Sequence, residues 1–159
     1  MSKRCCFTGH RDVPEEDYVK LMLALLKKME ELIQEGYTVF NTGGALGFDT
    51  MAASAVLRLK KKYHNIKLHM YLPFPQQADR WKREDRDMYE YFKKQSEKID
   101  FACESYTNYS MAKRNRALVD NADYCIAYCT KSTGGTVYTL NYAIGKGIDF
   151  INLASEIKK

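Results

Sequence analysis

The sequence contains no apolar run that approaches the ~18–20 residues needed to cross a bilayer. It also lacks the apolar core of a signal peptide, because its first four residues lead directly into a strand-like segment. These two features favour a cytoplasmic protein without a membrane partner.

Metal-binding patterns are missing as well. The chain has five cysteines, an odd number, and none belongs to a Cys-x-x-Cys pair with a second such pair downstream. Cys5 and Cys6 are adjacent, and Cys125 and Cys129 fall on one expected strand, so buried free thiols are favoured over disulfides or metal ligands. The three histidines are scattered along the chain. The sequence therefore indicates neither a metal site nor a bound cofactor.

The chain is large enough to form its own core. Of its 159 residues, 45% are hydrophobic, and domains of ~100–200 residues bury about two-thirds of their unfolded surface. We therefore expect one domain, residues 1–159. The net charge of +5 favours anionic ligands, but the runs Lys27-Lys28 and Lys60-Lys61-Lys62 fall on polar faces of expected helices, where lysines serve solubility. Nucleic acid is therefore not the expected partner.

Strand-like and helix-like segments alternate along the chain. The expected strands cover residues 4–8, 37–41, 66–72, 99–103, 124–129 and 148–153, with helices between them. This alternation predicts parallel strands joined by right-handed crossovers, with helices on both faces of the sheet. The expected fold is therefore α/β, a Rossmann-like three-layer α/β/α sandwich with a mostly parallel sheet, in which ligands lie beyond the carboxyl ends of the strands.

Two of the expected helices have an identifiable apolar face. The first helix begins near Asp12-Val13-Pro14-Glu15 and ends at Gly36, and its apolar residues recur at steps of three and four: Tyr18, Met22, Leu25, Met29 and Leu32. The charged helix over residues 82–98 carries its apolar residues on one side: Met88, Tyr91 and Phe92. We expect these faces to pack on the sheet.

Two glycine clusters are the most informative motifs. Thr42-Gly43-Gly44-Ala45-Leu46-Gly47 and Ser132-Thr133-Gly134-Gly135-Thr136 each follow an expected strand and precede an expected helix. Glycine lets backbone N–H groups approach a phosphate closely, and the helix that follows presents its positive N-terminal end to the same anion. The spacing departs from the G-x-G-x-x-G dinucleotide fingerprint. The two clusters therefore predict a nucleotide-like ligand held at both ends.

Other turns at the same edge carry polar and aromatic residues. Arg11 can form a bidentate pair with a phosphate, and His10 can donate to an oxyanion or exchange protons. Asp49 is either a helix cap or an acceptor for ribose hydroxyls. Phe74 or Trp81 can stack on a base, and core packing explains Trp81 equally well.

Two arginines lie close together on the helix expected over residues 111–121. Arg114 and Arg116 project from different faces of that helix, so we expect one of them to line the site and the other to pair with an acid such as Asp120. The complete set of predicted ligand-binding residues is Thr8, Gly9, His10, Arg11, Gly43, Gly44, Gly47, Asp49, Phe74, Arg114, Gly134, Gly135 and Thr136.

Taken in order, these motifs resemble those of the SLOG superfamily, which includes the SMF/DprA and LOG-like proteins, and most closely its YpsA/YoqJ-like branch. The resemblance covers essentially the whole chain, through Thr8-Gly9-His10-Arg11, Gly43-Gly44-Ala45-Leu46-Gly47-Phe48-Asp49, Leu72-Pro73-Phe74, Arg114-Asn115-Arg116 and Gly134-Gly135-Thr136. It implies a Rossmann-like domain that binds nucleotides or nucleotide-derived ligands, with both glycine clusters at the phosphates. It also implies a homodimer.

The LOG-type relatives are phosphoribohydrolases, and their motif combines an arginine in Met-x-x-Arg with a glutamate three residues after Gly-Thr. Here Arg114 matches the arginine, but Thr139 stands at the glutamate position. Glycosidic cleavage normally needs a carboxylate. We therefore expect a binding or sensor domain for a nucleotide-type small molecule, ADP-ribose-like, without turnover. The alternatives are an N-glycosidase with Arg114 on the phosphate and Asp49 as acid–base candidate, and, ranked last, single-stranded nucleic-acid binding as in DprA-like relatives.

Overall fold

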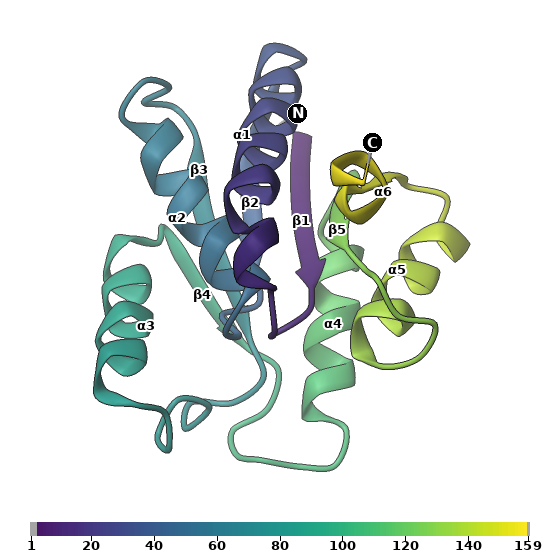
Figure 1. The fold of residues 1–159 in the computed structure, drawn as a ribbon. Coiled ribbons are helices and arrows are strands. Elements are labelled where there is room, and N and C mark those ends of the chain that lie inside the picture. Colours follow the sequence, from purple (N-terminus) through teal and green to yellow (C-terminus); the bar gives the residue numbers. More distant parts are fainter. Residues whose placement is uncertain (1–2, 159) are drawn as a thin grey trace.

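The computed structural model describes residues 3–158 (Figure 1). The strands are β1 (Lys3–Gly9), β2 (Tyr37–Thr42), β3 (Lys67–Leu72), β4 (Lys98–Phe101), β5 (Tyr124–Tyr128) and β6 (Asp149–Asn152). The helices are α1 (Tyr18–Gln34), α2 (Phe48–Lys60), α3 (Arg83–Gln95), α4 (Ser110–Asp120), α5 (Gly135–Gly145) and α6 (Leu153–Ile157), with a 3-10 turn at Glu15–Asp17 before α1. The expected alternation of strands and helices is confirmed.

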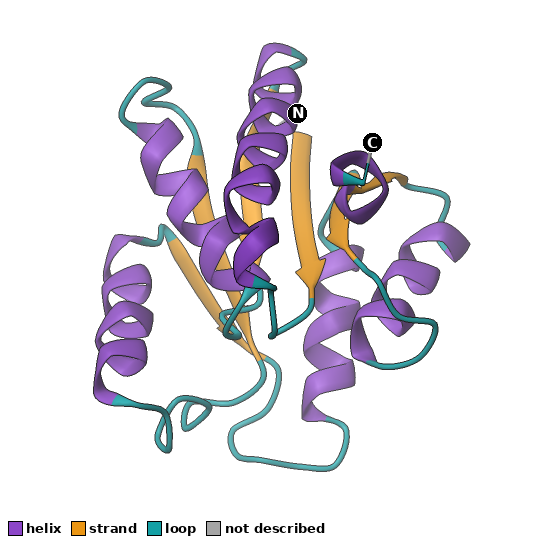
Figure 2. Cartoon of the chain, viewed as in Figure 1, coloured by secondary structure: helices purple, strands orange, loops and turns teal. Residues whose placement is uncertain are grey.

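All six strands form one parallel sheet in the order β4-β3-β2-β1-β5-β6. From β1 the chain winds outward through β2, β3 and β4, then returns to the other side of β1 as β5 and β6. Helices α1, α2 and α6 pack together, α3 packs beside α2, and α4 and α5 form a second pair (Figure 2). The predicted α/β Rossmann-like fold is therefore confirmed, and the strand order reverses between β1 and β5.

The apolar face of α1 differs from the predicted one at its first turn. Leu25, Met29 and Leu32 are buried as expected, together with Leu21, whereas Tyr18 is 47% exposed. The 3-10 turn delays the start of α1 to Tyr18, so this residue is aligned with the stripe but lies at its exposed N-terminal end, before the turns that are buried. The prediction for Tyr18 was wrong.

The buried stripe on α3 is narrower than predicted. The two buried residues of α3 are Tyr89 and Phe92. Met88 and Tyr91, which were expected to be buried, are 44% and 51% exposed. Helix α3 contacts the body of the protein mainly beside α2, near the outer strands, so only residues three apart on one line of the helix reach the core.

The cysteines are free thiols, as expected. Cys5, Cys6 and Cys125 are buried, and β5 ends at Tyr128, so Cys129 follows the strand instead of lying on it. Within residues 3–158, no three His, Cys, Asp or Glu side chains are grouped so that they could hold a metal ion. None of the described helices is both long and apolar enough to cross a membrane.

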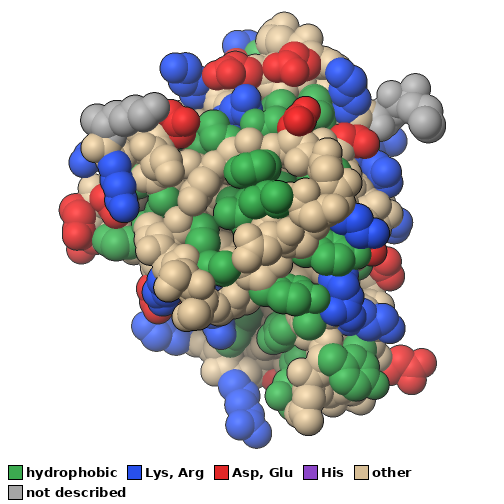
Figure 3. Space-filling view, turned by 90° about the vertical axis from the view of Figure 1, so that its right-hand side faces the viewer, with side chains coloured by type: hydrophobic (Ala, Val, Ile, Leu, Met, Phe, Trp, Pro, Cys, Tyr) green, Lys and Arg blue, Asp and Glu red, His purple; other side chains and the backbone are tan. Residues whose placement is uncertain are grey.

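The side of the molecule that carries α5 and α6 shows hydrophobic side chains near its centre (Figure 3). Lysine and arginine side chains lie mostly around the rim of this face, with acidic side chains among them. The exposed hydrophobic residues of α5 and β6 are Tyr138, Ile144 and Phe150. The positive charge on this face is therefore dispersed and does not form a continuous stripe.

We predict that Gly47 and Gly147 differ sharply in their tolerance of alanine. Their φ angles are 78° and 77°. Alanine rarely adopts this left-handed conformation, so each substitution introduces backbone strain of about 1–2 kcal/mol. A Cβ at position 47 would also overlap the backbone of Arg11, whereas a Cβ at position 147 meets nothing within 4 Å. Urea denaturation should show that Gly47→Ala costs at least about 3 kcal/mol. Equal losses in the two variants would contradict this close approach.

Candidate functional site

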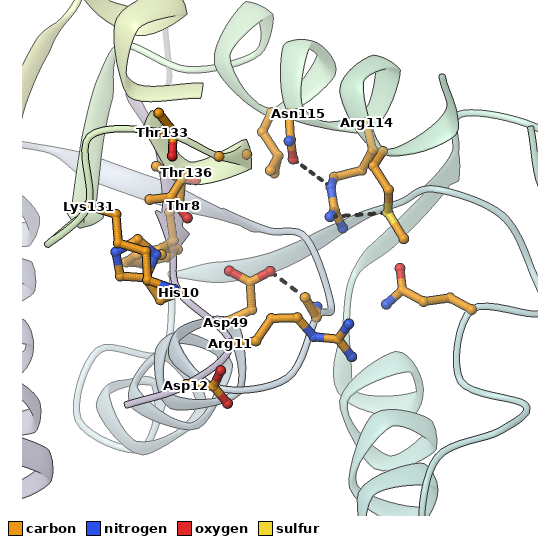
Figure 4. Close-up of a pocket in the computed structure, with 18 of the residues that line it drawn as sticks. Thr8, His10, Arg11, Asp12, Asp49, Arg114, Asn115, Lys131, Thr133 and Thr136 are labelled. Carbon is orange, nitrogen blue, oxygen red and sulfur yellow. Dashed lines mark hydrogen bonds between the residues drawn. The ribbon is translucent and has the colours of Figure 1, made fainter. Parts of the chain in front are cut away.

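A cavity of about 460 Å³ opens at the carboxyl edge of the sheet, where the strand order reverses between β1 and β5 (Figure 4). Five segments contribute its walls: the turn after β1, the chain around the start of α2, the loop between β3 and α3, one face of α4 and the loop that leads from β5 into α5. In doubly wound α/β folds this is the position where ligands bind. Cavities of ~300–1,000 Å³ are typical of small-molecule sites.

Most of the predicted residues line this cavity. They are Thr8, Gly9, His10, Arg11, Asp49, Arg114, Gly134, Gly135 and Thr136. The structure places the others, Gly43, Gly44, Gly47 and Phe74, outside its lining. Lys131 also lines the cavity but was not among the predicted residues. Its position directly before the second glycine cluster would have indicated it.

In the first glycine cluster only Ala45 lines the main cavity, and the glycines lie behind its wall. A Cβ on Gly44 would overlap the side chain of Leu72, so this glycine faces the core. The backbone N–H of Ala45 donates to Asp49 Oδ2 at 3.1 Å, and the carbonyl of Gly43 accepts a hydrogen bond from Arg114. Gly43 and Gly44, predicted to hold a phosphate, therefore do not line the main cavity. They allow close packing around the side chains of Arg114, Asp49 and Leu72.

The second glycine cluster borders the cavity directly. Gly134 has a φ of 111°, and helix α5 starts at Gly135. A Cβ at Gly134 would meet nothing within 4 Å, and one at Gly135 would meet only Asn115, at 3.9 Å. The backbone around the N-terminus of α5 is therefore open to the cavity, and the unpaired N–H groups of a helix start attract anions.

Arg114 is a buried cation whose charge is not balanced by a carboxylate. It is 7% exposed, and Nε donates to Asn115 Oδ1 at 2.9 Å, Nη1 to the Gly43 carbonyl and Nη2 to Met111 Sδ at 3.8 Å. Across residues 3–158, no carboxylate oxygen lies within 4 Å of this guanidinium. Burial lowers the pKa of Arg114, partly offset by Asp49. Guanidinium carries five N–H donors, so two remain for a ligand.

The second arginine of α4 does not form the predicted ion pair. Arg116 donates to the hydroxyl of Tyr138 at 2.9 Å. Asp120 is instead 3.6 Å from Lys146 Nζ and accepts a hydrogen bond from Tyr142. The prediction that Arg114 and Arg116 project from different faces is correct, but the partner of Arg116 is a tyrosine of α5, because α4 and α5 pack against each other.

Asp49 projects into the cavity from the first turn of α2 (Figure 4). Burial raises the pKa of its carboxyl from 3.8 to about 6, since Arg114, the Ala45 N–H and Arg11 compensate only in part. Asp49 Oδ2 is held by Ala45, so the other oxygen is available to accept a hydroxyl. A carboxyl with this pKa can change protonation state near neutral pH.

His10 connects the two loops at the reversal of strand order. The backbone N–H of Thr130 donates to His10 Nε2 at 2.8 Å, and the imidazole packs edge-on against Tyr128 at 5.7 Å. Burial, with Lys131, lowers the pKa of His10. Because Nε2 is an acceptor in a neutral ring, the proton is assigned to Nδ1. The expected proton exchange is therefore disfavoured, and His10 acts as a tether between β1 and β5.

The two aromatic candidates separate in the structure. Trp81 lines the cavity and packs edge-to-face on Tyr89, with ring centroids 5.3 Å apart. Phe74 instead packs on Tyr106, with centroids 5.6 Å apart. Of the two aromatic residues, Trp81 is the one in position to contact a ligand ring.

This fold and site define a Rossmann-like α/β protein with its cavity at the reversal of strand order. The chain belongs to the YspA SLOG family, whose model matches residues 6–147. This finding confirms the resemblance to the YpsA-like branch of the SLOG superfamily that the sequence motifs indicated.

Relatives and solved structures agree with this assignment. UPF0398 proteins of Bacillus cereus and Bacillus thuringiensis are each 27% identical over 127 residues, which is 78% of this chain and 69% of the relative. DprA from Streptococcus pneumoniae superposes with a TM-score of 0.67 at 16% identity, over 94% of this chain and 49% of DprA. DprA from Helicobacter pylori, described for its single-stranded DNA binding mode, gives 0.67 at 18% identity, over 93% and 63%. The chain thus spans about half to two-thirds of the DprA chains, and the likeness shows a shared fold.

The raised pKa of Asp49 predicts a pH-dependent effect of Asp49→Asn on stability. The folded protein binds the extra proton between pH 3.8 and about 6, so stability falls as the pH rises through this window, and ionised Asp49 destabilises the fold above it. In urea denaturation, Asp49→Asn should be more stable than the wild type by about 1–3 kcal/mol at pH 7.5, with the difference vanishing near pH 4. The exposed Asp12→Asn is the control, and a pH-independent difference for Asp49→Asn would contradict the assignment.

Proposed function

We propose that the chain binds a nucleotide-type small molecule, ADP-ribose-like, through its phosphate and without cleaving it. The observation that carries this proposal is the buried guanidinium of Arg114, which has no carboxylate partner in residues 3–158 and lies in the same cavity as the N-terminus of α5. A buried charge is costly unless it is paired. A phosphate would supply the missing negative charge, with bidentate hydrogen bonds from the guanidinium and further bonds from the helix amides.

The sugar of such a ligand has a partner on the opposite wall. Asp49 is buried, with one carboxylate oxygen held by Ala45. The remaining oxygen suits a pair of ribose hydroxyls, which donate to it whether or not a phosphate is bound nearby. Arg11 and Lys131 at the mouth add positive charge that attracts the anionic ligand from solution.

Absence of turnover is supported by Thr139. This residue stands where LOG-type relatives carry glutamate, and it is fully buried, with Oγ1 donating to the Gly135 carbonyl at 2.8 Å. The side chain is therefore turned back onto α5 and does not line the cavity. One observation favours the second candidate, an N-glycosidase: the carboxyl of Asp49, with its pKa of about 6, faces the cavity and could act as a general acid.

Single-stranded DNA is a further candidate, because the similar Helicobacter pylori structure is described with that ligand. The exposed rings of Tyr106 and Tyr109, in the loop before α4, could stack with bases. Against this candidate, the cations on the face seen in Figure 3 are dispersed. Binding to an oligonucleotide would have to weaken steeply with salt.

The proposal extends to the domain, the cellular compartment and the oligomeric state. We propose that residues 1–159 act as one nucleotide-binding domain in the cytoplasm and form a homodimer, as the family resemblance implies. The edge strand β6 and the adjacent helix α5 expose Phe150 and Ile144, which offer an apolar contact for such a dimer.

Arg114 and Arg116 provide a matched pair for testing the phosphate site. Arg114→Gln should weaken binding of AMP, ADP-ribose, cyclic ADP-ribose or NAD, whichever the wild type binds, by about 10–100-fold in isothermal titration, because a charge-assisted hydrogen bond is lost. Arg116→Gln, on the same helix but bonded to Tyr138, should leave the affinity unchanged.

A second variant guards against misfolding of Arg114→Gln. Gly135→Val adds a side chain on the cavity wall, where only Asn115 is near, and Gly145→Val adds the same side chain in open space at the far end of α5. Binding should be lost in the first and kept in the second. No binding by the wild type at millimolar ligand would contradict the proposed function, and release of free base in incubations, abolished by Asp49→Asn, would replace it with the N-glycosidase.

A further inference from the structure

A smaller chamber of about 180 Å³ adjoins the main cavity. Ala45, Asp49 and Trp81 line both spaces, so they form the partition between them. The chamber lies between α2 and α3, and a cavity of roughly 150 Å³ is large enough to hold a benzene ring. One aromatic ring therefore fits into it.

The walls of the chamber combine aromatic rings with carboxylates. The rings belong to Trp81, Tyr89 and Phe92, and the carboxylates to Asp49, Glu84 and Asp85. The faces of aromatic rings are electron-rich and attract cations, most strongly where water is excluded. Within residues 3–158 no lysine or arginine lines this chamber, although Lys93 Nζ lies over the Tyr89 ring, 5.1 Å from its centroid. Its electrostatic character is therefore the opposite of the arginine side of the main cavity.

A buried hydroxyl beside the chamber lacks a partner. Tyr89 is 3% exposed, and its hydroxyl makes no hydrogen bond within the described part of the chain. Buried polar groups in native proteins are nearly always paired, so an unpaired one needs an explanation. Asp49 forms no ion pair within 4 Å in residues 3–158, although Ala45 donates to its carboxylate and Arg114 and Arg11 act on it from farther away. A positively charged ligand group in the chamber would lie beside the Asp49 carboxylate and add favourable charge there.

We propose that the chamber binds a positively charged aromatic ring, of the pyridinium type, that belongs to the same ligand whose phosphate lies at Arg114. This inference rests on the proposed function and specifies the far end of its ligand. The ring lies among the side chains of Trp81, Tyr89 and Phe92, and the carboxylates of Asp49 and Asp85 balance its charge. The ligand then has opposite charges at its two ends, matching the two sides of the site.

The test compares two probes that differ chiefly in the charge of the ring. Oxidised nicotinamide mononucleotide has a cationic pyridinium, and its reduced form has a neutral ring with the same carboxamide, ribose and phosphate. Isothermal titration of the full chain should show that the oxidised form binds at least about fivefold more tightly. Ribose 5-phosphate, which has no ring, tests the phosphate site alone.

Two acidic residues on α3 supply the matched variants. Asp85 lines the chamber, whereas Asp87 does not and is exposed. Asp85→Asn should reduce the preference for the oxidised probe to about twofold or less, while Asp87→Asn should retain the wild-type preference. Tyr89→Phe removes an unpaired hydroxyl that is too deeply buried to touch the ring, so it should raise the thermal midpoint of unfolding and leave the preference for the oxidised probe unchanged.

The outcomes separate the two proposals. Equal affinity for the oxidised and reduced probes, with ribose 5-phosphate still bound, would overturn the chamber assignment and leave the proposed function intact. A preference for the oxidised probe that survives Asp85→Asn unchanged would also overturn it. If neither ribose 5-phosphate nor either mononucleotide binds, the proposed function fails and the inference falls with it.

Discussion

One buried positive charge organises the site. The guanidinium of Arg114 is held by the Gly43 carbonyl and by Asn115, and these acceptors are neutral, so the charge itself stays unbalanced. A Cβ on Gly43 would lie within 3 Å of both Arg114 and Asp49, which explains why glycine is needed there although it does not face the cavity. Burial also raises the pKa of Asp49, and Arg114, which forms no direct ion pair with it, lowers that pKa only in part. An arrangement of this kind is unfavourable alone and becomes favourable with an anion present.

The parallel sheet brings these groups together from distant parts of the sequence. The reversal of strand order between β1 and β5 opens a gap into which His10, the start of α2, α4 and the loop before α5 all project. His10 holds the gap at a fixed width, because its imidazole accepts the N–H of Thr130, 120 residues away. The main cavity and the chamber that adjoins it at Trp81 then differ in charge: Arg114 lines the cavity, and acidic residues line the chamber.

The sequence predicted the strands, their parallel pairing and most of the residues at the cavity, because hydrophobic periodicity and the glycine turns report local structure directly. It could not predict which way a loop faces. Gly43 and Gly44 have the same motif context as Gly134 and Gly135, yet the first pair packs on Leu72 and Arg114 and the second pair is open. That difference depends on tertiary contacts with β3 and α4, as does the bond from Arg116 to Tyr138 that replaced the predicted ion pair. The chamber also could not be predicted from the sequence, because it forms where α2 and α3 pack together.

The most direct test of the central claim is a crystal structure of the protein soaked with ADP-ribose. We expect a phosphate oxygen within hydrogen-bond distance of the Arg114 guanidinium and of the first backbone amides of α5, with a ribose hydroxyl on Asp49. A phosphate bound elsewhere on the surface, with the Arg114 guanidinium still bonded only to protein atoms, would contradict the account.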